Sequence, residues 1–565
     1  MVALIPVSRR IWDMKYRLKQ DDGTPVDADP AATWARVAEA LAAVEAPAAR
    51  AGWRARFEAV LADLRFLPAG RILAGSGAPR RVTLFNCFVM GRIPDDLGGI
   101  FTHLREAALT LQQGGGIGYD FSTLRPEGTL VAGTGGRASG PLSFMDVWDA
   151  MCRTILSAGS RRGAMMGTLR CDHPDIEAFV AAKADPARLR MFNLSVLVTD
   201  AFIAAVRADK PWPLVFDGEV HRTVAARDLW RRIMRATYDH AEPGVIFIDR
   251  VNDANNLWYQ EDIRATNPCG EQPLPPYGAC LLGSVNLARL VRQPFTPAAA
   301  LDLDALADLV PTAVRMLDNA IDASGFPLAV QAEEARAKRR IGLGITGLAD
   351  ALAMCGLTYG SEAAVAATER WVAALRDHAY RASVDLARER GAFPAFDAAR
   401  YLEGRMPQSL GADLRAAIAR DGVRNALLTS VAPTGTISLL ANNVSSGLEP
   451  IYSRAYTRDV RHADGSRTQE SVVDPALTLY RAMFGADAPL PESFVTAEDL
   501  TPDAHIAMQA AVQRSIDAGV SKTVNVPADI DFAAFENVYL RAYDLGCKGC
   551  TTYRPNPTTG AVLTA

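Results

Sequence analysis

"ATNPCGEQPL", residues 265–274, places an amide, a thiol and a carboxylate on alternate positions, at Asn267, Cys269 and Glu271. The proline in this stretch disfavours the α conformation in the residue before it, and the glycine permits a sharp local path. We therefore expect an extended loop, in which side chains repeat their direction every second residue. The three polar groups would then face one ligand together. Taken singly, the same residues also fit a buried cysteine, a turn former and a solvated glutamate.

The bulk composition is that of an ordinary globular protein. A length of 565 residues exceeds the usual size of a single core, so the chain should hold several domains or one large barrel with additions. The net charge of −4 gives no excess positive field, so we expect no nucleic-acid partner. The N-terminus has too short an apolar run for a signal peptide, and no later stretch has the length of a membrane span. We therefore predict a cytoplasmic protein with no membrane partner.

The cysteines are sparse and predict chemistry rather than a disulfide framework. There are eight, at Cys87, Cys152, Cys171, Cys269, Cys280, Cys355, Cys547 and Cys550. In a reducing compartment, any disulfide among them should be transient and catalytic. The one tight pair is "CKGC", residues 547–550, and it has no second pair or histidines at ligand spacing. We therefore predict no metal site.

Helical and strand patterns alternate along the chain. Residues 32–67 have apolar residues at helical spacing, and residues 225–240, 301–323 and 361–391 read as later helices. Strand candidates lie between them, at "RVTLFNCFVM", "MFNLSVLV", "PLVF", "GVIFI", "NALLTSV" and "KTVNV". This alternation favours an α/β architecture.

Three loops could hold a ligand. "QQGGGIGYDF", residues 112–121, lies between a predicted helix and a predicted strand, and a dinucleotide fingerprint needs the reverse order. Close ligand approach and a plain tight turn both stay open for these glycines. The loop 433–436 between a strand and a helix expected from Ile437 suits a phosphate, or is a threonine-capped turn. Arg161 and Arg162, in a glycine-containing loop, could bind phosphates or be solvated charges.

Together these pieces resemble the catalytic chain of ribonucleotide reductases, specifically the adenosylcobalamin-dependent class II. The similarity runs over nearly the whole chain, in motif order: "KYRLKQDDG", "FNCFVM", "GGGIGYDFSTLRPEG", "SRRGAMMGTLRCDHPDI", "NPCGEQPLPPYGACLLGSVNL", "APTGTISLLANNVSSGLEP" and "KGCTTYRPN". The resemblance implies a ten-stranded α/β barrel of two half-barrels with an internal finger loop. It also implies a helical N-terminal region over 1–80, the barrel with its specificity-site loops over 81–555, and a short tail over 556–565.

The resemblance implies a role for each residue of the opening stretch. Cys269 would become a thiyl radical and take the 3′ hydrogen of the substrate ribose. Glu271 would be the base at the 3′ hydroxyl, and Asn267 would hydrogen-bond the substrate during water loss. Cys87 and Cys280 would be the reducing pair. They lie far apart in the sequence, so only the fold could bring their Cα atoms within the roughly 7 Å that a disulfide allows.

The resemblance also implies binding residues and ligands. The substrate sugar and diphosphate would be held by Asn86, Gly115, Gly116, Pro433, Thr434, Gly435 and Thr436. A specificity site for deoxynucleotide or ATP effectors would be formed by Asp95, by Arg161 and Arg162, and by the loops 125–137 and 158–169. The cofactor would be adenosylcobalamin. A homodimer is compatible with this pattern, with the oligomeric state left open.

Absent motifs favour class II within the family. Class I chains carry tandem tyrosines near the C-terminus, whereas Thr552 precedes Tyr553 here. Class III chains carry a glycyl-radical motif and usually lack the glutamate found at 271. The Asp-x-His-x-x-Gly signature is missing, which fits base-on cobalamin binding. The predicted function is reduction of ribonucleoside diphosphates or triphosphates to deoxyribonucleotides. The alternatives are a class I large subunit with an unusual radical route, or a non-catalytic thiol or zinc protein.

Many members of this family continue into a cysteine-rich tail that re-reduces the internal pair, whereas this sequence stops at Ala565. We therefore expect a thioredoxin-type reductant or a separate cysteine-bearing chain as a partner. Cys547 and Cys550 are expected to be structural. No added N-terminal ATP-binding domain is visible, so we expect no overall activity control by ATP and dATP.

Overall fold

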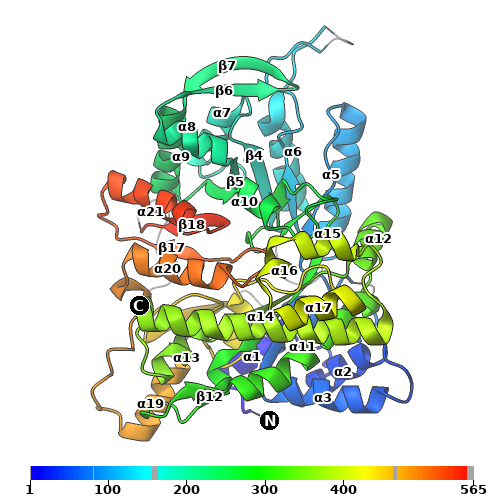
Figure 1. The fold of residues 1–565 in the computed structure, drawn as a ribbon, viewed down its shortest axis with the longest axis vertical. Coiled ribbons are helices and arrows are strands. Elements are labelled where there is room, and N and C mark those ends of the chain that lie inside the picture. The colour runs from blue at the N-terminus through cyan, green and yellow to red at the C-terminus, as the bar shows by residue number, and fades with distance from the viewer. Residues whose placement is uncertain are drawn as a thin grey trace.

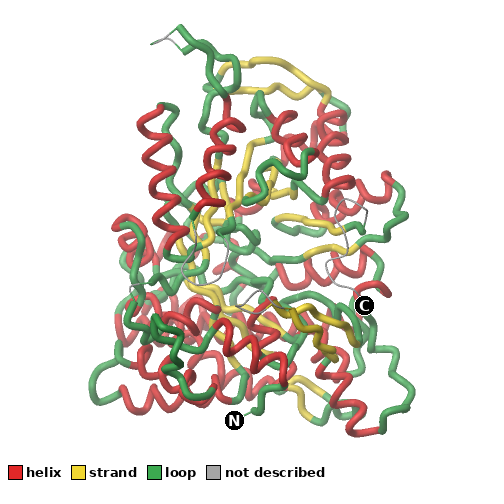
Figure 2. Tube along the Cα trace, turned by 180° about the vertical axis from the view of Figure 1, so that it is seen from behind, coloured by secondary structure: helices red, strands yellow, loops and turns green. Residues whose placement is uncertain are grey.

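A central sheet of ten strands runs through the middle of the molecule, with helices around it (Figure 1, Figure 2). The computed structural model describes residues 2–80, 82–131, 133, 135–155, 163–461 and 467–555. The sheet order is β1-β11-β2-β3-β4-β5-β8-β18-β17, with β14 also pairing with β11. The predicted α/β class, with a helical N-terminal region, is confirmed. Among the described residues, no helix is both long and apolar enough to cross a bilayer.

The N-terminal region is helical and packs mainly against two later helices, Leu303–Ala323 and Gly435–Leu440. Its helices are α1 (Pro6–Lys15), α2 (Pro30–Ala42), α3 (Arg50–Ala62) and α4 (Gly70–Gly75). Helix α2 begins where the Asp29 side chain accepts a hydrogen bond from the Ala32 amide, with Pro30 in the first turn. Strand β1 (Phe66–Pro68) also belongs to this region and pairs antiparallel with β11. The helical region thus contributes a strand to the sheet, which its helical sequence pattern did not predict.

Five neighbouring strands are parallel. Parallel neighbours need a crossover connection, and here each crossover contains at least one helix. The strands are β2 (Cys87–Val89), β3 (Gly116–Asp120), β4 (Met165–Arg170), β5 (Phe192–Val198) and β8 (Gly244–Phe247). The connecting helices are α5 (Leu97–Gln112), α6 (Gly140–Thr154), α7 (Ile176–Ala181), α8 (Asp200–Arg207) and α9 (Ala226–His240), and α10 (Ile248–Asp253) follows β8. The strands are almost wholly buried, as parallel sheets covered by helices are.

The other strands are β11 (Ala279–Asn286), β14 (Ile341–Thr346), β17 (Thr523–Asn525) and β18 (Gly549–Tyr553). Strand β11 begins beside β2 and continues between β1 and β14, whereas β18 pairs with both β8 and β17. Isolated bridges join Leu343 to Thr429 and Val431 to Val520. Only these bridges link the two ends of the sheet within the described residues, so a closed barrel stays a prediction.

Long helices cover this second half of the sheet, and α11 and α14 run side by side across the lower half of Figure 1. The helices are α11 (Leu303–Ala323), α12 (Ala329–Lys338), α13 (Leu348–Met354), α14 (Glu362–Arg390), α15 (Ala398–Glu403), α16 (Arg405–Ser409), α17 (Ala412–Asp421), α18 (Gly435–Leu440), α19 (Pro475–Phe484), α20 (Pro502–Gln513) and α21 (Phe532–Asp544). Two-stranded sheets pair β6 (Pro211–Phe216) with β7 (Glu219–Ala225), β9 (Ala265–Thr266) with β10 (Pro273–Leu274), β12 (Val291–Arg292) with β13 (Ala300–Leu301), and β15 (Ala455–Arg461) with β16 (Arg467–Val473).

Several sequence predictions differ from the structure. The expected strand over "RVTLFNCFVM" is formed only at β2, and the expected strand over "NALLTSV" is reduced to isolated bridges. Helix α18 begins at Gly435, two residues before the expected start. Strands β11 and β14 were not predicted. Every residue of both is buried, so neither has the polar alternation that marks a half-exposed strand.

Candidate active site

Residues 265–274 form a short hairpin, which we call the finger hairpin: β9, a tip over 267–272, and β10. The Gly270 amide donates to the Asn267 carbonyl at 3.1 Å, and the Gln272 amide donates to Asn267 Oδ1 at 2.9 Å. Gly270 has φ +82°, a conformation that favours glycine. The prediction of an extended loop was therefore wrong. The glycine and the asparagine side chain together close a tight turn.

Both halves of the sheet hold the finger hairpin in place. A Cβ atom at Gly118 of β3 would lie 1.8 Å from the Thr266 carbonyl oxygen, so only glycine lets the hairpin lie this close. On the other side, the Glu271 carbonyl accepts from the Gly519 amide at 2.8 Å and from Ser430 Oγ at 2.9 Å. Asn193 Nδ2 of β5 donates to the Pro268 carbonyl at 2.8 Å. These contacts fix the backbone on both sides of the tip.

Cys87 and Cys280 lie directly opposite each other on β2 and β11. Residues paired across antiparallel strands have Cα atoms about 4.5–5.5 Å apart, which is within the range that a disulfide spans. Both side chains are buried, and both are free thiols. The fold therefore brings the two predicted redox cysteines together from distant parts of the sequence.

Asn267 and Glu271 contact Cys87. Asn267 Nδ2 lies 3.1 Å from Cys87 Sγ, and the Cys87 thiol donates to Glu271 Oε1 at 3.6 Å. Burial raises the pKa of the Cys87 thiol, and the nearby Glu271 carboxylate raises it further. Burial also raises the pKa of Cys280. Both cysteines are therefore protonated at neutral pH, so each sulfur carries a hydrogen atom that it can donate.

Cys269 faces a different space from its two neighbours. Its side chain is exposed and borders a cavity of about 350 Å³, whereas Asn267 and Glu271 are buried against Cys87. The expectation that alternate residues 267, 269 and 271 face one ligand together was therefore wrong in detail, because the turn rotates Cys269 away. Cys269 still lies close enough for its charge to raise the pKa of Cys87.

The glycine run at 114–116 packs against protein. A Cβ at Gly114 would lie 2.1 Å from the Arg71 guanidinium carbon, and one at Gly115 would lie 2.7 Å from the Phe88 ring. A Cβ at Gly116 would lie 3.2 Å from Pro268 of the finger hairpin. Because these neighbours leave little or no room for a Cβ atom, packing within the protein is enough to explain why glycine occupies all three positions. Asn86, nearby, has a buried Oδ1 with no hydrogen-bond partner among the described residues.

The loop 433–436 leads into the short helix α18. Thr434 has φ +54°, and its hydroxyl accepts from the Gly447 amide at 2.7 Å and lies 3.0 Å from Thr346 Oγ1. This hydroxyl therefore holds the loop. Gly435 and Thr436 are exposed, and Pro433 borders the cavity beside Cys269.

The predicted specificity site is only partly described. The Asp95 carboxylate accepts from the Arg125 amide at 3.1 Å and from Arg125 Nε at 2.7 Å, so it fixes the start of the loop 125–137. Arg161 and Arg162 lie outside the described residues. Their effector role stays a prediction.

The sequence did not single out three residues that border the same cavity, namely Glu449, Gln509 and Lys522, and it treated a fourth, Cys550, only as structural. Lys522 begins the segment "KTVNV", which was predicted only as a strand. Glu449 lies in "APTGTISLLANNVSSGLEP", a motif that supported the family resemblance without a role for this glutamate. Cys550 and Cys547 are buried, and burial raises the pKa of Cys547 to about 12. Within the described ranges, no three histidine, cysteine or acidic side chains gather as a metal site.

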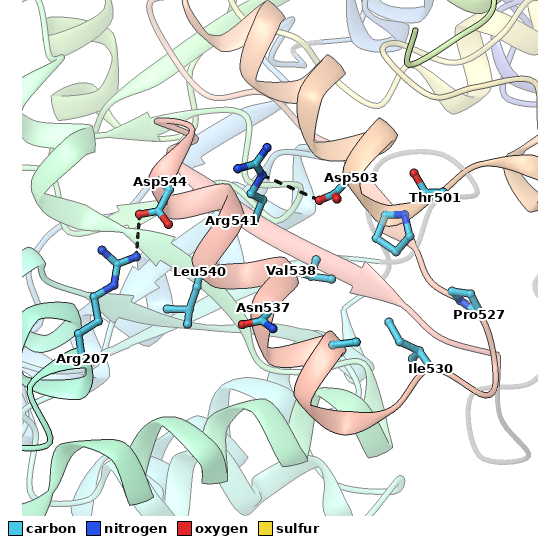
Figure 3. Close-up of a pocket in the computed structure, with 12 residues that line it drawn as sticks. Arg207, Thr501, Asp503, Pro527, Ile530, Asn537, Val538, Leu540, Arg541 and Asp544 are labelled. Atoms are coloured by element: carbon cyan, nitrogen blue, oxygen red, sulfur yellow. Dashed lines mark hydrogen bonds and ion pairs between the residues drawn. The ribbon is translucent and has the colours of Figure 1, made fainter.

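A larger hollow, of about 860 Å³, lies away from all of the predicted residues, between α21, the start of α20 and Arg207 of α8 (Figure 3). Its charged groups are paired with each other: Arg207 with Asp544 at 2.6 Å, and Arg541 with Asp503 at 3.9 Å (Figure 3). The finger hairpin, in contrast, brings buried thiols, an amide and a carboxylate together.

Comparisons with known proteins agree with this geometry. Residues 85–553 match the family model for the ribonucleotide reductase barrel domain, and residues 6–81 match that for the ribonucleotide reductase all-alpha domain. The vitamin B12-dependent ribonucleoside-diphosphate reductase of Mycobacterium tuberculosis H37Rv is 40% identical over 572 aligned positions, covering 97% of this chain and 77% of that protein. The protein of the same name from Thermoplasma acidophilum is 37% identical over 531 positions, covering 90% of this chain and 66% of that protein.

Proposed function

Because the chain belongs to the ribonucleotide reductase family, we propose that it reduces ribonucleoside diphosphates to 2′-deoxyribonucleoside diphosphates in an adenosylcobalamin-dependent reaction. The relatives' names support both the B12 dependence and the diphosphate substrate, which the sequence left open. A ribonucleoside-diphosphate reductase subunit alpha from Chlamydia muridarum is also similar, but at 27% identity. The B12-dependent reaction is therefore favoured over a class I radical route.

One observation carries the proposal: two buried thiols face each other across β2 and β11, and an amide and a carboxylate contact one of them. Reduction of a ribonucleotide needs two electrons. Two thiols supply them, together with two hydrogens, when they become a disulfide, and the 2′ hydroxyl leaves as water. The protonated state of Cys87 and Cys280 suits this step, because each sulfur must deliver a hydrogen.

Three residues of the finger hairpin carry out the other steps of the proposed reaction. Cys269, as a thiyl radical, takes the 3′ hydrogen of the ribose and returns it at the end. Glu271 removes the proton of the 3′ hydroxyl, and the departing 2′ hydroxyl takes the Cys87 hydrogen. Asn267 hydrogen-bonds the substrate while water is lost. The 3.6 Å contact between the Cys87 thiol and Glu271 Oε1 supports a shared path for the proton.

The cavity beside Cys269 fits the nucleoside part of adenosylcobalamin. Its volume is about 350 Å³, and a buried acceptor oxygen of Gln509 on its wall lacks a partner among the described residues. When bound, the cofactor supplies the radical that activates the Cys269 thiol. The protein's own part is to hold the thiol at the cavity wall on a fixed hairpin.

Further roles extend the proposal. Asn86, the glycines at 115 and 116, and the loop 433–436 would hold the substrate sugar and diphosphate. The unpartnered Asn86 Oδ1 and the exposed start of α18 support this. Asp95, Arg161 and Arg162 would bind a deoxynucleotide or ATP effector. A thioredoxin-type reductant, or a separate cysteine-bearing chain, would restore the thiols.

The test is deoxynucleotide formation from each ribonucleoside diphosphate, with a dithiol reductant, with and without adenosylcobalamin. We expect product only with the cofactor. Metal analysis of the same sample addresses the zinc alternative. Product formed without adenosylcobalamin, or bound zinc with no product, would overturn the proposal.

A further inference from the structure

Lys522 is a buried lysine on the wall of the cavity beside Cys269. Its side chain is 0% exposed. The Nζ atom lies 2.9 Å from His505 Nδ1 and 2.6 Å from the Thr523 carbonyl, and it also donates to Glu449 Oε2. An ammonium group has three N–H donors, so all three are used within the protein. Lys522 therefore holds its neighbours in place and has no donor left for a ligand.

Glu449 is the partner that Lys522 holds. Its Oε1 accepts from the Thr523 amide at 2.8 Å, and its side chain is 28% exposed and borders the cavity. Each carboxylate oxygen has two lone pairs, so both oxygens retain capacity to accept another hydrogen bond. The carboxylate is thus oriented at two points and still open to a hydrogen-bond donor in the cavity.

Gln509 adds a second acceptor to the same wall. Its Nε2 donates to the Gly549 carbonyl at 3.0 Å, which fixes the direction of the amide. Its Oε1 is buried and has no hydrogen-bond partner among the described residues. Buried carbonyl oxygens are nearly always hydrogen-bonded, so this one favours a donor supplied by a ligand.

These groups select the chemistry of the ligand. A phosphate would meet the negative charge of Glu449. Two lysines border the cavity: Lys522 uses all three N–H donors within the protein, and Lys548 donates to the Asp517 carbonyl at 2.5 Å and the Ala518 carbonyl at 3.1 Å. Hydroxyl and amino groups would instead donate to both acceptors, and a carboxylate accepting from a ribose hydroxyl is a common way to bind a nucleoside. The volume of about 350 Å³ lies in the range of small-molecule pockets.

We propose that Glu449 binds the vicinal hydroxyls of the neutral nucleoside part of adenosylcobalamin, with Lys522 as the positioning residue. The assignment rests on the proposed function for the identity of the nucleoside. Neither Glu449 nor Lys522 has a part in the cysteine chemistry proposed above. Gln509 offers its free oxygen to a second donor of the same ligand.

The experiment is calorimetry of the full chain with two probes, 5′-deoxyadenosine and 2′,5′-dideoxyadenosine, which lacks one hydroxyl of the diol. We expect the wild type to bind the diol at least about tenfold more tightly, since a hydrogen bond to a charged group is worth about a factor of 10–100. Glu449→Gln should lose this preference. Lys522→Met should reduce it, and Lys522→Arg should restore part of it, which a merely structural lysine would not do.

The matched control is Glu242→Gln. Glu242 borders the same cavity, but its carboxylate is engaged by Lys183 and by the Leu194 amide, so its loss should leave the diol preference intact. Equal binding of the two probes by the wild type would overturn the proposal, and this result needs no variant to fold. A diol preference retained in a folded Glu449→Gln protein would also overturn it. Wild-type reductase activity is assayed separately with adenosylcobalamin, so that failure of the proposed function is seen independently.

Discussion

Cys87 and Cys280 are partners in the antiparallel register of β2 and β11, where β11 leaves β2 and continues beside β14. The pairing is short, with Phe88 opposite Ala279 as its only other residue pair. Phe88 is fully buried, which anchors β2 at this point. Because the strands already hold the two Cα atoms at disulfide distance, oxidation of the pair requires little backbone movement.

Replacing either cysteine of this pair should stop repeated turnover. Cys87→Ser or Cys280→Ser leaves one thiol where two electrons are needed. We expect steady-state product formation to fall to background, and thiol counting to show two thiols lost per turnover in the wild type. Cys171→Ser, at another buried free cysteine, is the control and should keep turnover. Loss of thiols at Cys547 and Cys550 instead would mean that the redox pair was wrongly chosen.

Cys269→Ser should abolish turnover and leave nucleotide binding nearly unchanged. A hydroxyl has almost the shape of a thiol but does not support thiyl chemistry. Product formation and substrate affinity are measured on the same preparation. Cys355→Ser, at a partly exposed cysteine outside the site, serves as the control. Deoxynucleotide formation by the Cys269 variant would contradict the assignment of the radical residue.

Gly118→Ala should displace the finger hairpin. The new Cβ would lie 1.8 Å from the Thr266 carbonyl oxygen, so the hairpin backbone must move. We expect a loss of about 1–3 kcal/mol in stability from overpacking. Activity should fall by about 100-fold, because a shift of about 1 Å misaligns Cys269.

The matched control is Gly52→Ala in α3, where a Cβ meets nothing within 4 Å. This change should raise stability by about 0.5–1 kcal/mol, because alanine is the better helix former. Thermal unfolding and product formation are measured for both variants. Full activity in the Gly118 variant would show that the hairpin tolerates the shift.

The sequence predicted elements with strong periodicity and missed those without it. Helices α9, α11 and α14, with their apolar stripes, were predicted to within two residues of their bounds. Strand β5 was also predicted, because it is apolar and bounded by turns. Strands β11 and β14 are buried throughout, so their residues give no alternation to read.

For the site, sequence spacing suggested a group of polar residues but not their directions. Period-two reasoning put 267, 269 and 271 on one face, whereas the turn at Gly270 separates Cys269 from the other two. The meeting of Cys87 and Cys280 depends on strand order, which no local pattern encodes. Glu449 and Lys522 meet for the same reason, since their segments join only in the folded chain.

Glu271→Gln should make the Cys87 thiol titrate at a lower pH. Burial raises the pKa of Cys87 first, and the Glu271 carboxylate adds to the rise. Removing that negative charge therefore allows the thiolate to form at lower pH, although burial still keeps it above its ordinary value. The measurement is the pH dependence of Cys87 alkylation, followed by mass spectrometry. Cys171 in the same sample is the internal control, because burial raises its pKa to about 12 without Glu271.

Two buried aspartates lie between α13 and α19. The carboxyl groups of Asp350 and Asp474 lie close enough for the charge of one to shift the pKa of the other. Asp350 also accepts from the Ser445 amide at 2.6 Å, and Asp474 caps α19 by accepting from the Leu477 amide at 2.9 Å. Burial raises the pKa of both, and the charge of Asp350 raises that of Asp474 further. The pair therefore keeps a proton to a higher pH than the same two aspartates would in an unfolded chain.

The sign of the pH dependence follows from this. The folded pKa values lie above the unfolded value of 3.8, so the native state binds more protons, and stability falls as pH rises through the folded pKa values. Asp474→Asn removes one titrating group, keeps an oxygen for the α19 cap, and supplies an amide donor to Asp350. We expect it to raise stability by about 1 kcal/mol at pH 8 and by less at pH 5. Thermal unfolding at both pH values measures the difference. Asp531→Asn, at the cap of α21, is the matched control and should show no such trend, whereas a pH-independent effect of Asp474→Asn would contradict the shared proton.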